Sequence, residues 1–244
     1  MTRQTLGIIG VGAFGSLMQE HLAPYFDLVL HDARKNPVSS AKNVKIGDLA
    51  AAASCDVVVL AVPVQQMESV LRAIAPLVKP GALVMDVASV KLKPVELMQN
   101  LLPAHVDIVG THPLFGPQSA KDGIKGLNMV VANVRGERAA SVCSFLRDEL
   151  GLNVFEATAE AHDRELAYVQ GLTHLLAKVV VALDLPDFCF TTKTYEHMQK
   201  MVDMVRHDSD ELFMAIEKEN PFVGEAKKAF FTAAKALEDR LSQR

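Results

Sequence analysis

Short, continuously apolar runs alternate with helical stretches over the first two thirds of the chain. Residues 57–61, for example, are apolar without a break and are followed by a helical pattern over residues 65–77. Unbroken apolar strands are typical of a parallel sheet that is covered on both faces. Strands and helices that alternate at this spacing favour right-handed βαβ units. We therefore predict an α/β fold with a doubly wound parallel sheet of the Rossmann type.

The same patterns place the individual elements. Strands are expected over residues 6–9, 28–31, 57–61, 83–86, 108–111, 129–132 and 154–155. Helices are expected over residues 14–22, 65–77, 94–102, 137–150, 159–183, 191–206, 208–219 and 221–241. Because no strand pattern returns after residue 156, we predict two domains. Residues 1–156 would form the α/β domain, and residues 157–244 a helical domain that completes its core by pairing with a second copy.

Charge and cysteine content narrow the class of protein. The 25 basic and 29 acidic residues give a net charge of -4, which argues against a surface for nucleic acid or anionic lipid. The longest apolar run, residues 57–64, is far shorter than the roughly 20 residues of a membrane helix, and the N-terminus does not resemble a signal peptide. Cys55, Cys143 and Cys189 are odd in number, distant and set among apolar neighbours. We expect buried thiols in a cytoplasmic protein.

A glycine-rich turn joins the first predicted strand to the first predicted helix. We expect Gly10 to allow the tight turn, Gly12 to let the backbone approach a pyrophosphate, and Gly15 to let the helix pack closely on the strand. Ala13 and Phe14 would lie at the helix N-terminus, where N–H groups bind phosphates. The turn therefore predicts a dinucleotide site, and glycines that serve only the turn are the alternative.

Two further segments belong to this predicted nucleotide site. Asp32 ends the second predicted strand, 17 residues after Gly15, where a carboxylate would bind the ribose hydroxyls of NAD. Arg34 could instead hold the 2′-phosphate of NADP, so we predict that NAD is preferred and that NADP use is possible. Val62 and Pro63 end the next strand as a plausible edge over the cofactor, although a strand-ending proline explains them almost as well.

A candidate chemical site follows the fourth and fifth predicted strands. Residues 86–91 and 110–117 would both lie beyond the carboxyl ends of these strands, where open α/β sheets bind ligands. His112 is expected on a loop beside the nicotinamide, and the near-neutral pKa of imidazole suits proton abstraction. The alternative is a histidine that merely caps the strand.

The remaining histidines give no metal signal, and we predict no metal site. No HExxH or CxxC pattern occurs, and five histidines lack companions at ligand spacing, namely His21, His31, His105, His197 and His207. Gln170 and His174 are four residues apart and share one face of a predicted helix, with Gly171 between them allowing a close approach. A buried hydrogen bond explains this polar pair as well as a ligand does.

Several of these segments together resemble the prephenate/arogenate dehydrogenase family of tyrosine biosynthesis. They are residues 10–15, 86–91, 110–117, 162–174 and 192–196, the last being most similar to plant-type arogenate dehydrogenases. The resemblance covers nearly the whole chain. It implies NAD(P)-dependent oxidative decarboxylation of a cyclohexadienyl substrate by an enzyme whose helical domain builds an intertwined homodimer.

The resemblance also assigns roles to residues. His112 would be the base that takes the proton of the ring hydroxyl, and Ser89 would bond the same hydroxyl or orient the histidine. Gln170 and His174 would line the substrate pocket, and Lys193 would bind a substrate carboxylate. Many family members have an arginine near the position of Lys193, and a lysine lacks its bidentate fork. We expect no fused mutase and no separate regulatory domain.

Two other functions compete with this one. A two-domain 3-hydroxyacid dehydrogenase would have a catalytic lysine four residues after Gly171, where this chain has Leu175. A catalytically silent NAD-binding redox sensor would not need His112, Ser89 and Lys193 together. The choice between arogenate and prephenate stays open, because Asp122 and Glu196 are both candidates to bind the amino group of arogenate.

Overall fold

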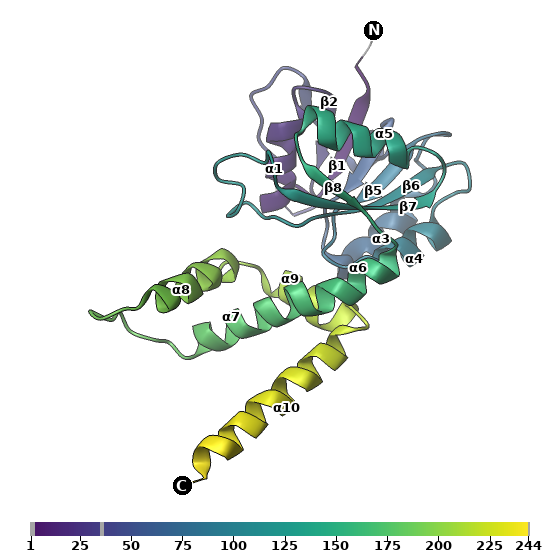
Figure 1. Cartoon of the computed structure of the whole chain (residues 1–244). Coiled ribbons are helices and arrows are strands. Elements are labelled where there is room, and N and C mark those ends of the chain that lie inside the picture. Colours follow the sequence, from purple (N-terminus) through teal and green to yellow (C-terminus); the bar gives the residue numbers. More distant parts are fainter. Residues whose placement is uncertain (1–2, 35–36, 244) are drawn as a thin grey trace. The chain divides into compact units, whose positions relative to one another are not determined.

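The computed structural model describes residues 3–34 and 37–243, which form two compact units (Figure 1). The first unit ends at Glu160 and the second runs from Ala161 onward. The boundary predicted at residue 156 coincides with the last residue of strand β8. No helix in these described ranges is long and apolar enough to cross a membrane.

The first unit is built on one sheet of eight strands in the order β3-β2-β1-β4-β5-β6-β7-β8. The strands are β1 (Thr5–Ile9), β2 (Asp27–His31), β3 (Val44–Ile46), β4 (Val57–Leu60), β5 (Leu83–Asp86), β6 (Asp107–Pro113), β7 (Asn128–Arg135) and β8 (Asn153–Glu156). The pairings from β3 to β6 are all parallel, β7 is antiparallel to β6, and β8 is parallel to β7. The predicted doubly wound α/β fold is confirmed, with two final strands that run in the opposite direction.

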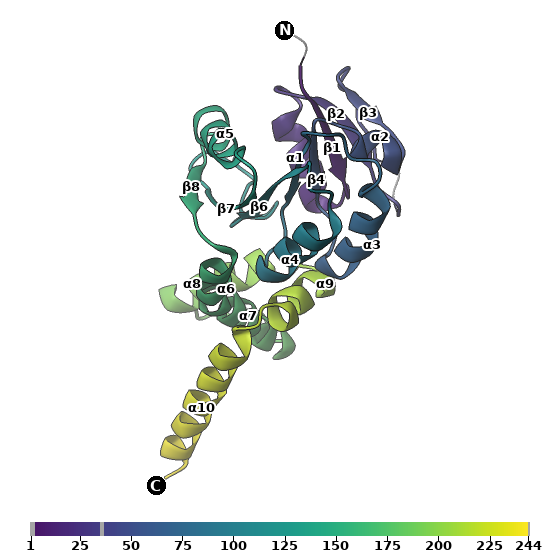
Figure 2. The same ribbon diagram turned by 90° about the vertical axis from the view of Figure 1, so that its right-hand side faces the viewer.

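Helices cover both faces of this sheet. They are α1 (Ala13–Leu22), α2 (Leu49–Ala53), α3 (Val64–Ile74), α4 (Leu92–Leu101) and α5 (Ala139–Ser144), which continues as the π-helical turn η1 (Phe145–Glu149). A Cβ atom built at Gly7 would meet Ala52 of α2, and one built at Gly110 would meet Val95 of α4, so α2 and α4 share a face. Figure 2 shows α2 and α3 on one side of the sheet and α5 on the other.

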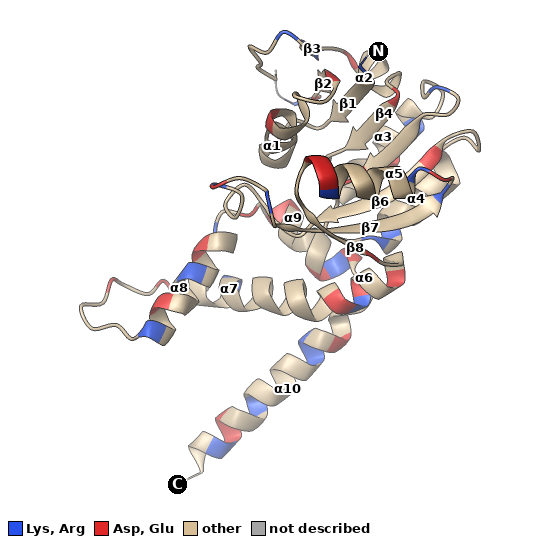
Figure 3. Ribbon diagram, turned by 45° about the horizontal axis from the view of Figure 1, so that its top comes forward, with Lys and Arg blue, Asp and Glu red and all other residues tan. Residues whose placement is uncertain are grey.

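The strands form the core because their side chains are apolar on both faces. Every residue of β4 is buried, and Ile8, Leu30 and Val84 are fully inaccessible to solvent. Figure 3 shows few charged residues on the central strands and charges of both signs on the helices. This pattern is the one expected of a sheet that helices cover on both sides.

The second unit contains helices only. The single helix predicted over residues 159–183 is present as α6 (Ala159–Leu166), the π-helical turn η2 (Ala167–Leu172) and α7 (Thr173–Ala182). It ends before Asp184, which has a φ of 47°, and therefore earlier than the predicted stop at Pro186. The other elements are α8 (Lys193–Val205), α9 (Asp210–Met214), the π-helical turn η3 (Ala215–Glu219) and α10 (Val223–Ser242).

The three cysteines differ in environment. Cys55 and Cys143 are buried, as predicted, and burial raises the pKa of both thiols. Cys189 is exposed in the connection between α7 and α8, so the prediction that all three are buried is wrong for this residue. Its apolar neighbours in the sequence belong to a segment that is itself exposed.

Candidate functional site

The turn between β1 and α1 has the close contacts that its glycines predict. Gly10 has a φ of +99°, and its N–H donates to the carbonyl oxygen of His31 on β2 at 2.8 Å. A Cβ atom at Gly10 would collide with the carbonyl of Ala61, and one at Gly15 would collide with the carbonyl oxygen of Gly10. Both positions therefore need glycine for packing: Gly10 because the chain after β4 passes next to it, and Gly15 because α1 lies directly on the turn.

Gly12 differs, because its missing side chain leaves open space. A Cβ atom built at Gly12 would have no heavy atom within 4 Å. Gly12 precedes the first residue of α1, Ala13, and both line a pocket of about 410 Å³ with Val11, Ser16, Gln19, Pro37 and Val38. Open space beside a helix N-terminus fits an anionic group such as a pyrophosphate. Phe14 turns away from this pocket and contacts Phe115 with ring centroids 6.0 Å apart.

Asp32 lies directly beside this turn. Its Oδ2 accepts a hydrogen bond from Val11 N at 2.7 Å, and its Oδ1 accepts one from Arg34 N at 2.8 Å. Each carboxylate oxygen can accept more than one hydrogen bond, so both can also receive a ligand hydroxyl. The side chain is half-buried, whereas Arg34 is exposed. Lys35 and Asn36, part of the turn that contains Arg34, lie outside the described residues.

The edge formed by Val62 and Pro63 also adjoins the turn. Ala61 N donates to Ile9 O at 2.8 Å, and a Cβ atom at Gly10 would lie 3.0 Å from the Val62 side chain. Pro63 is the residue before the first turn of α3 and has extended backbone. Pro63 therefore starts the helix three residues after β4 ends at Leu60.

His112 lies on a strand, and the prediction that it lies on a loop is wrong. Strand β6 continues to Pro113, and His112 pairs with Val130 of the antiparallel β7. The predicted end at residue 111 missed these pairs because a proline in the sequence signals a strand end. His112 is only 3% exposed. Ser89 is half-buried in the loop that follows the neighbouring strand β5.

A buried ion pair occupies the end of β5. Asp86 and Lys91 have fully buried side chains, and Lys91 Nζ donates to Asp86 Oδ2. The same oxygen accepts from Ala88 N at 2.9 Å, so the pair holds both ends of the loop that carries Ser89. The sequence predicts that this segment lies near the chemistry but indicates no role for the two residues, because an aspartate and a lysine five residues apart carry no local signal of burial.

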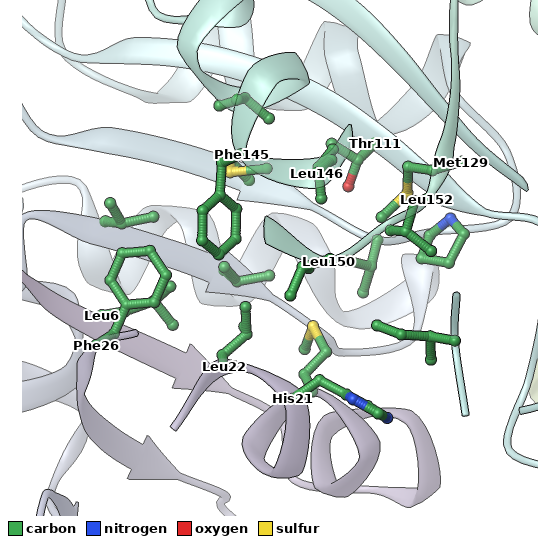
Figure 4. Close-up of a pocket in the computed structure, with 18 of the residues that line it drawn as sticks. Leu6, His21, Leu22, Phe26, Thr111, Met129, Phe145, Leu146, Leu150 and Leu152 are labelled. Atoms are coloured by element: carbon green, nitrogen blue, oxygen red, sulfur yellow. The ribbon is translucent and has the colours of Figure 1, made fainter. Parts of the chain in front are cut away.

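A separate apolar cavity of about 350 Å³ lies on the face of the sheet that α1 and α5 cover, opposite to α2 and α4 (Figure 4). It is enclosed by α1, by the segment from α5 to Leu152, which includes Phe145, and by side chains of the central strands such as Leu6. Thr111 and Pro113, on either side of His112, also line it. Strand side chains alternate between faces, so His112 points away from this cavity. Its apolar lining does not suit a charged ligand.

In the second unit, His174 is held between two acceptors. Its Nδ1 lies 3.0 Å from Gln170 O, and its Nε2 lies 3.0 Å from Asp208 Oδ2. His174 contacts the backbone carbonyl of Gln170 and not its side chain. The predicted pairing of the two side chains is therefore not observed. Asp208 was missed because 34 residues separate it from His174. Gly171 allows a close approach, as predicted, since a Cβ atom there would lie 2.6 Å from Val223 of α10.

Lys193 lies apart from His174 within this unit. It is the first residue of α8, its side chain is 86% exposed, and its Nζ contacts Glu196 Oε2 at 2.8 Å. Asp208, the partner of His174, comes after the other end of α8. A helix of 13 residues is about 20 Å long, so one chain does not bring Lys193 and His174 together. Glu196 is engaged by Lys193, and Asp122 is exposed between β6 and β7.

A second histidine of this unit is also paired with a carboxylate. His162 Nδ1 lies 2.8 Å from Asp163 Oδ1, and both side chains are fully buried. Asn220 Nδ2 donates to Asp163 O at 2.8 Å and joins the pair to the start of α10. Among the residues that the structure describes, no group of three or more His, Cys, Asp or Glu side chains is arranged to hold a metal ion.

Comparison with solved structures finds the same fold. Prephenate dehydrogenase from Aquifex aeolicus, solved in complex with hydroxyphenyl propionate and NAD+, superposes with a TM-score of 0.78 at 19% identity. The match covers 99% of this chain and 91% of that one. Synechocystis arogenate dehydrogenase superposes with a TM-score of 0.72 at 16% identity, covering 98% and 92% of the two chains.

Sequence comparison identifies the family. A model of the nucleotide-binding domain of prephenate dehydrogenase matches residues 23–129. Arogenate dehydrogenase 1 of Arabidopsis thaliana is 29% identical over 98% of this chain, which spans only 39% of that protein's length. Arogenate dehydrogenase 2 of the same plant is 33% identical over 98% of this chain and 71% of its own length. Since this relative aligns with nearly every element described above, the chain belongs to the prephenate and arogenate dehydrogenase family.

Proposed function

We propose that the chain catalyses the NAD(P)-dependent oxidative decarboxylation of arogenate or prephenate to tyrosine or 4-hydroxyphenylpyruvate. The observation that carries this proposal is His112, which is buried at the end of β6 beside the loop that bears Ser89. His112 lies near the end of β6 and Ser89 follows β5, in a sheet whose first turn has open space at Gly12. Family membership supplies the substrate class.

The residues of the β1–α1 turn fit a nicotinamide dinucleotide. Gly12 provides open space at the N-terminus of α1, and Asp32 is fixed beside it, where its carboxylate would accept from ribose hydroxyls. Ala13, Gly10 and Gly15 build the turn itself. When bound there, the cofactor supplies the acceptor for the hydride.

The chemistry assigned to this chain is proton transfer and orientation. His112 takes the proton of the ring hydroxyl as the hydride leaves the same carbon. Ser89 bonds that hydroxyl or orients the histidine. The bond to the ring carboxylate then breaks, carbon dioxide leaves, and its electron pair completes the aromatic ring. Burial of His112 keeps water from competing for the proton.

The second unit would supply substrate contacts and the dimer. Gln170 and His174 are proposed to line the substrate pocket, with Asp208 holding the His174 ring. That Lys193 binds a substrate carboxylate stays a prediction, and its distance from His174 within one chain favours a contribution from a partner subunit. A homodimer through the helical unit agrees with the apolar side chains exposed there.

A cytoplasmic location is likewise proposed, on the strength of the buried free thiols Cys55 and Cys143. The names of both Arabidopsis relatives place those proteins in the chloroplast. The location is therefore a property to test for this chain by fractionation.

The decisive experiment crosses NAD or NADP with arogenate or prephenate and measures reduced cofactor. Turnover with at least one pair is expected, with NAD preferred by kcat/KM, since the Asp32 carboxylate would repel a 2′-phosphate. Asp32→Ser should move selectivity toward NADP, and Arg34→Ala should weaken NADP use and leave NAD use nearly unchanged. No turnover in any combination would refute the proposed activity and would favour a non-catalytic NAD-binding protein.

A further inference from the structure

The fully buried pair of Asp86 and Lys91 has no role in the proposed chemistry so far. Burying two charges costs desolvation energy that their mutual attraction barely offsets, so such a pair is weak evidence for stability. The pair also lies at the end of β5, beside the strand that carries His112. The two charges therefore lie where they can act on that histidine.

One oxygen of this pair is left unsatisfied. Asp86 Oδ2 accepts from Lys91 Nζ and Ala88 N, whereas Oδ1 is buried without a hydrogen-bond partner in the described part of the chain. Asp86 pairs with Gly110 in register, and a Cβ atom built at Gly110 would lie 3.5 Å from Oδ1. The unsatisfied oxygen thus faces β6. A buried acceptor without a donor calls for a functional explanation.

His112 lies on the same face as this oxygen. It is two residues after Gly110 on a strand that is regular at this point. The His112 side chain therefore points to the same face as a Cβ atom built at Gly110, which is the face covered by α4. With strands about 4.8 Å apart and a rise of about 3.3 Å per residue, the Cα atoms of Asp86 and His112 are roughly 8 Å apart. In a buried site this is close enough for strong electrostatic coupling.

Asp86 also fixes the backbone on both sides of the site. Thr111, which directly precedes His112, donates from Oγ1 to the main-chain carbonyl of Asp86. The carboxylate of Asp86 holds Ala88 and Lys91, which flank Ser89. One residue therefore connects the strand of the proposed base to the loop of its proposed partner.

Other charged groups around β6 are more distant or more exposed. The neighbour of His112 on β7 is the apolar Val130. On α4, Glu96 is exposed and Lys93 half-buried. Arg135 of β7 binds carbonyls at the opposite end of β6, next to Asp107. Within the described residues of these packed elements, Asp86 and Lys91 are the fully buried charges on this face.

We propose that Asp86 and Lys91 are positioning residues that set the basicity and orientation of His112. The inference rests on the proposed function, in which His112 is the base. When His112 accepts the substrate proton, the Asp86 carboxylate stabilises the imidazolium that forms. Lys91 pairs with Oδ2 of that carboxylate in its buried site and so leaves Oδ1 directed toward β6.

The test measures the titration midpoint of the His112 ring by NMR, with the signal assigned by its loss in His112→Asn, and the pH profile of kcat. Asp86→Asn retains size and the acceptor for Ala88 N but removes the negative charge. It should lower the midpoint by about one pH unit or more and lower kcat about tenfold, with KM for NAD little changed. Asp56→Asn removes a carboxylate that is paired with Lys79 just before the start of β4, at the opposite end of the strands, and should leave the midpoint unchanged.

A double variant controls for misfolding of Asp86→Asn. Asp86→Asn leaves the Lys91 charge buried without the Asp86 charge, whereas Asp86→Asn with Lys91→Met removes both charges. The double variant should fold, with a smaller downward shift of the midpoint than in Asp86→Asn. Midpoints within about 0.2 pH units of wild type in the folded variants would make the pair merely structural and overturn the inference. The NMR midpoint requires no turnover, so this result is distinct from failure of the proposed activity. Failure of the activity would appear instead as no turnover in the wild type, or as an active His112→Asn variant.

Discussion

The two units of this chain complete their cores to different degrees. In the first unit, the sheet is covered by helices on both faces, and its central strands are almost wholly buried. In the second unit, Leu176, Val179 and Leu183 form an exposed apolar stripe along and just after α7. Thirteen of the eighteen large apolar side chains that are exposed among the described residues belong to the second unit.

This difference indicates that the two units have different roles. A covered sheet can hold buried charges such as Asp86 and a buried histidine such as His112 in fixed positions. A helical unit of fewer than 90 residues buries little surface by itself and gains stability from association. We infer that the first unit determines the chemistry and that the second is completed by another copy of the chain.

The largest effect is expected from removing the proposed base of the first unit. His112→Asn should lower kcat by roughly 10²–10⁴-fold, because the amide cannot accept the hydroxyl proton. NAD binding, measured by calorimetry, should stay at the wild-type level, and so should the oligomeric state. Near-full activity in this variant would reduce His112 to a buried residue of β6.

The next largest effect is expected from placing a charge on the apolar stripe of the helical unit. Val179→Glu should weaken self-association about 100-fold, since a carboxylate would have to be desolvated at the interface. Sedimentation velocity over a concentration series measures this. Ile46→Glu, at an exposed apolar position of β3 in the first unit, is the matched control and should not change association. Equal behaviour of the two variants would contradict the proposed dimer surface.

A third experiment sharpens the contrast within the first unit, between glycines needed for packing and one reserved for a ligand. Gly15→Ala forces a methyl group onto the carbonyl of Gly10 and should cost about 2 kcal/mol of unfolding free energy. Gly12→Ala meets no atom within 4 Å, so stability should change little while NAD affinity falls. Urea unfolding and NAD titration separate the two effects. Wild-type NAD affinity in Gly12→Ala would place the cofactor elsewhere.

The smallest effect concerns acid stability of the first unit. The N–H and Oγ1 of Thr5, at 3.0 and 2.8 Å, together with Lys79 lower the pKa of Asp56 to about 2. A carboxyl with a lowered pKa stabilises the fold above its unfolded pKa, near 4, and this contribution is lost as the pH falls toward 2. Because the side chain is 41% exposed, screening limits the contribution to about 0.5–1 kcal/mol. Asp56→Asn should be less stable than wild type at pH 7 and equal to it below about pH 2, as urea unfolding at several pH values would measure.

Strong local patterns could be read correctly from the sequence. The strand at residues 83–86 was predicted to the residue, because a buried parallel strand must be apolar throughout. Strand β3 was missed, since only Val44 of its three residues is even half-buried. Helix α2 was missed because its run of alanines shows no amphipathic contrast, although Asp48 caps it by accepting from Ala51 N at 2.8 Å.

The site was only partly predictable, because only some of its contacts are local in the sequence. The glycines of the first turn carry a local signal, because their spacing encodes contacts within one strand and one helix. Strand direction has no such signal, so the antiparallel β7 that draws His112 into the sheet was not foreseen. Contacts between distant segments, such as His174 with Asp208, also leave no local trace.

Helix α10 has a consequence for how the chain behaves in dilute solution. Its 20 residues span about 30 Å, yet only Val223 and Ala226 near its start are buried, and it is exposed from Phe231 onward (Figures 1 and 2). An isolated helical stretch of this length is marginal in water, so its order depends on what covers it. If a second copy does so, mass action makes the ordered fraction a function of protein concentration. The far end of α10 would then be ordered at high abundance and frayed when the protein is scarce, and hydrogen exchange at two dilutions would record the difference.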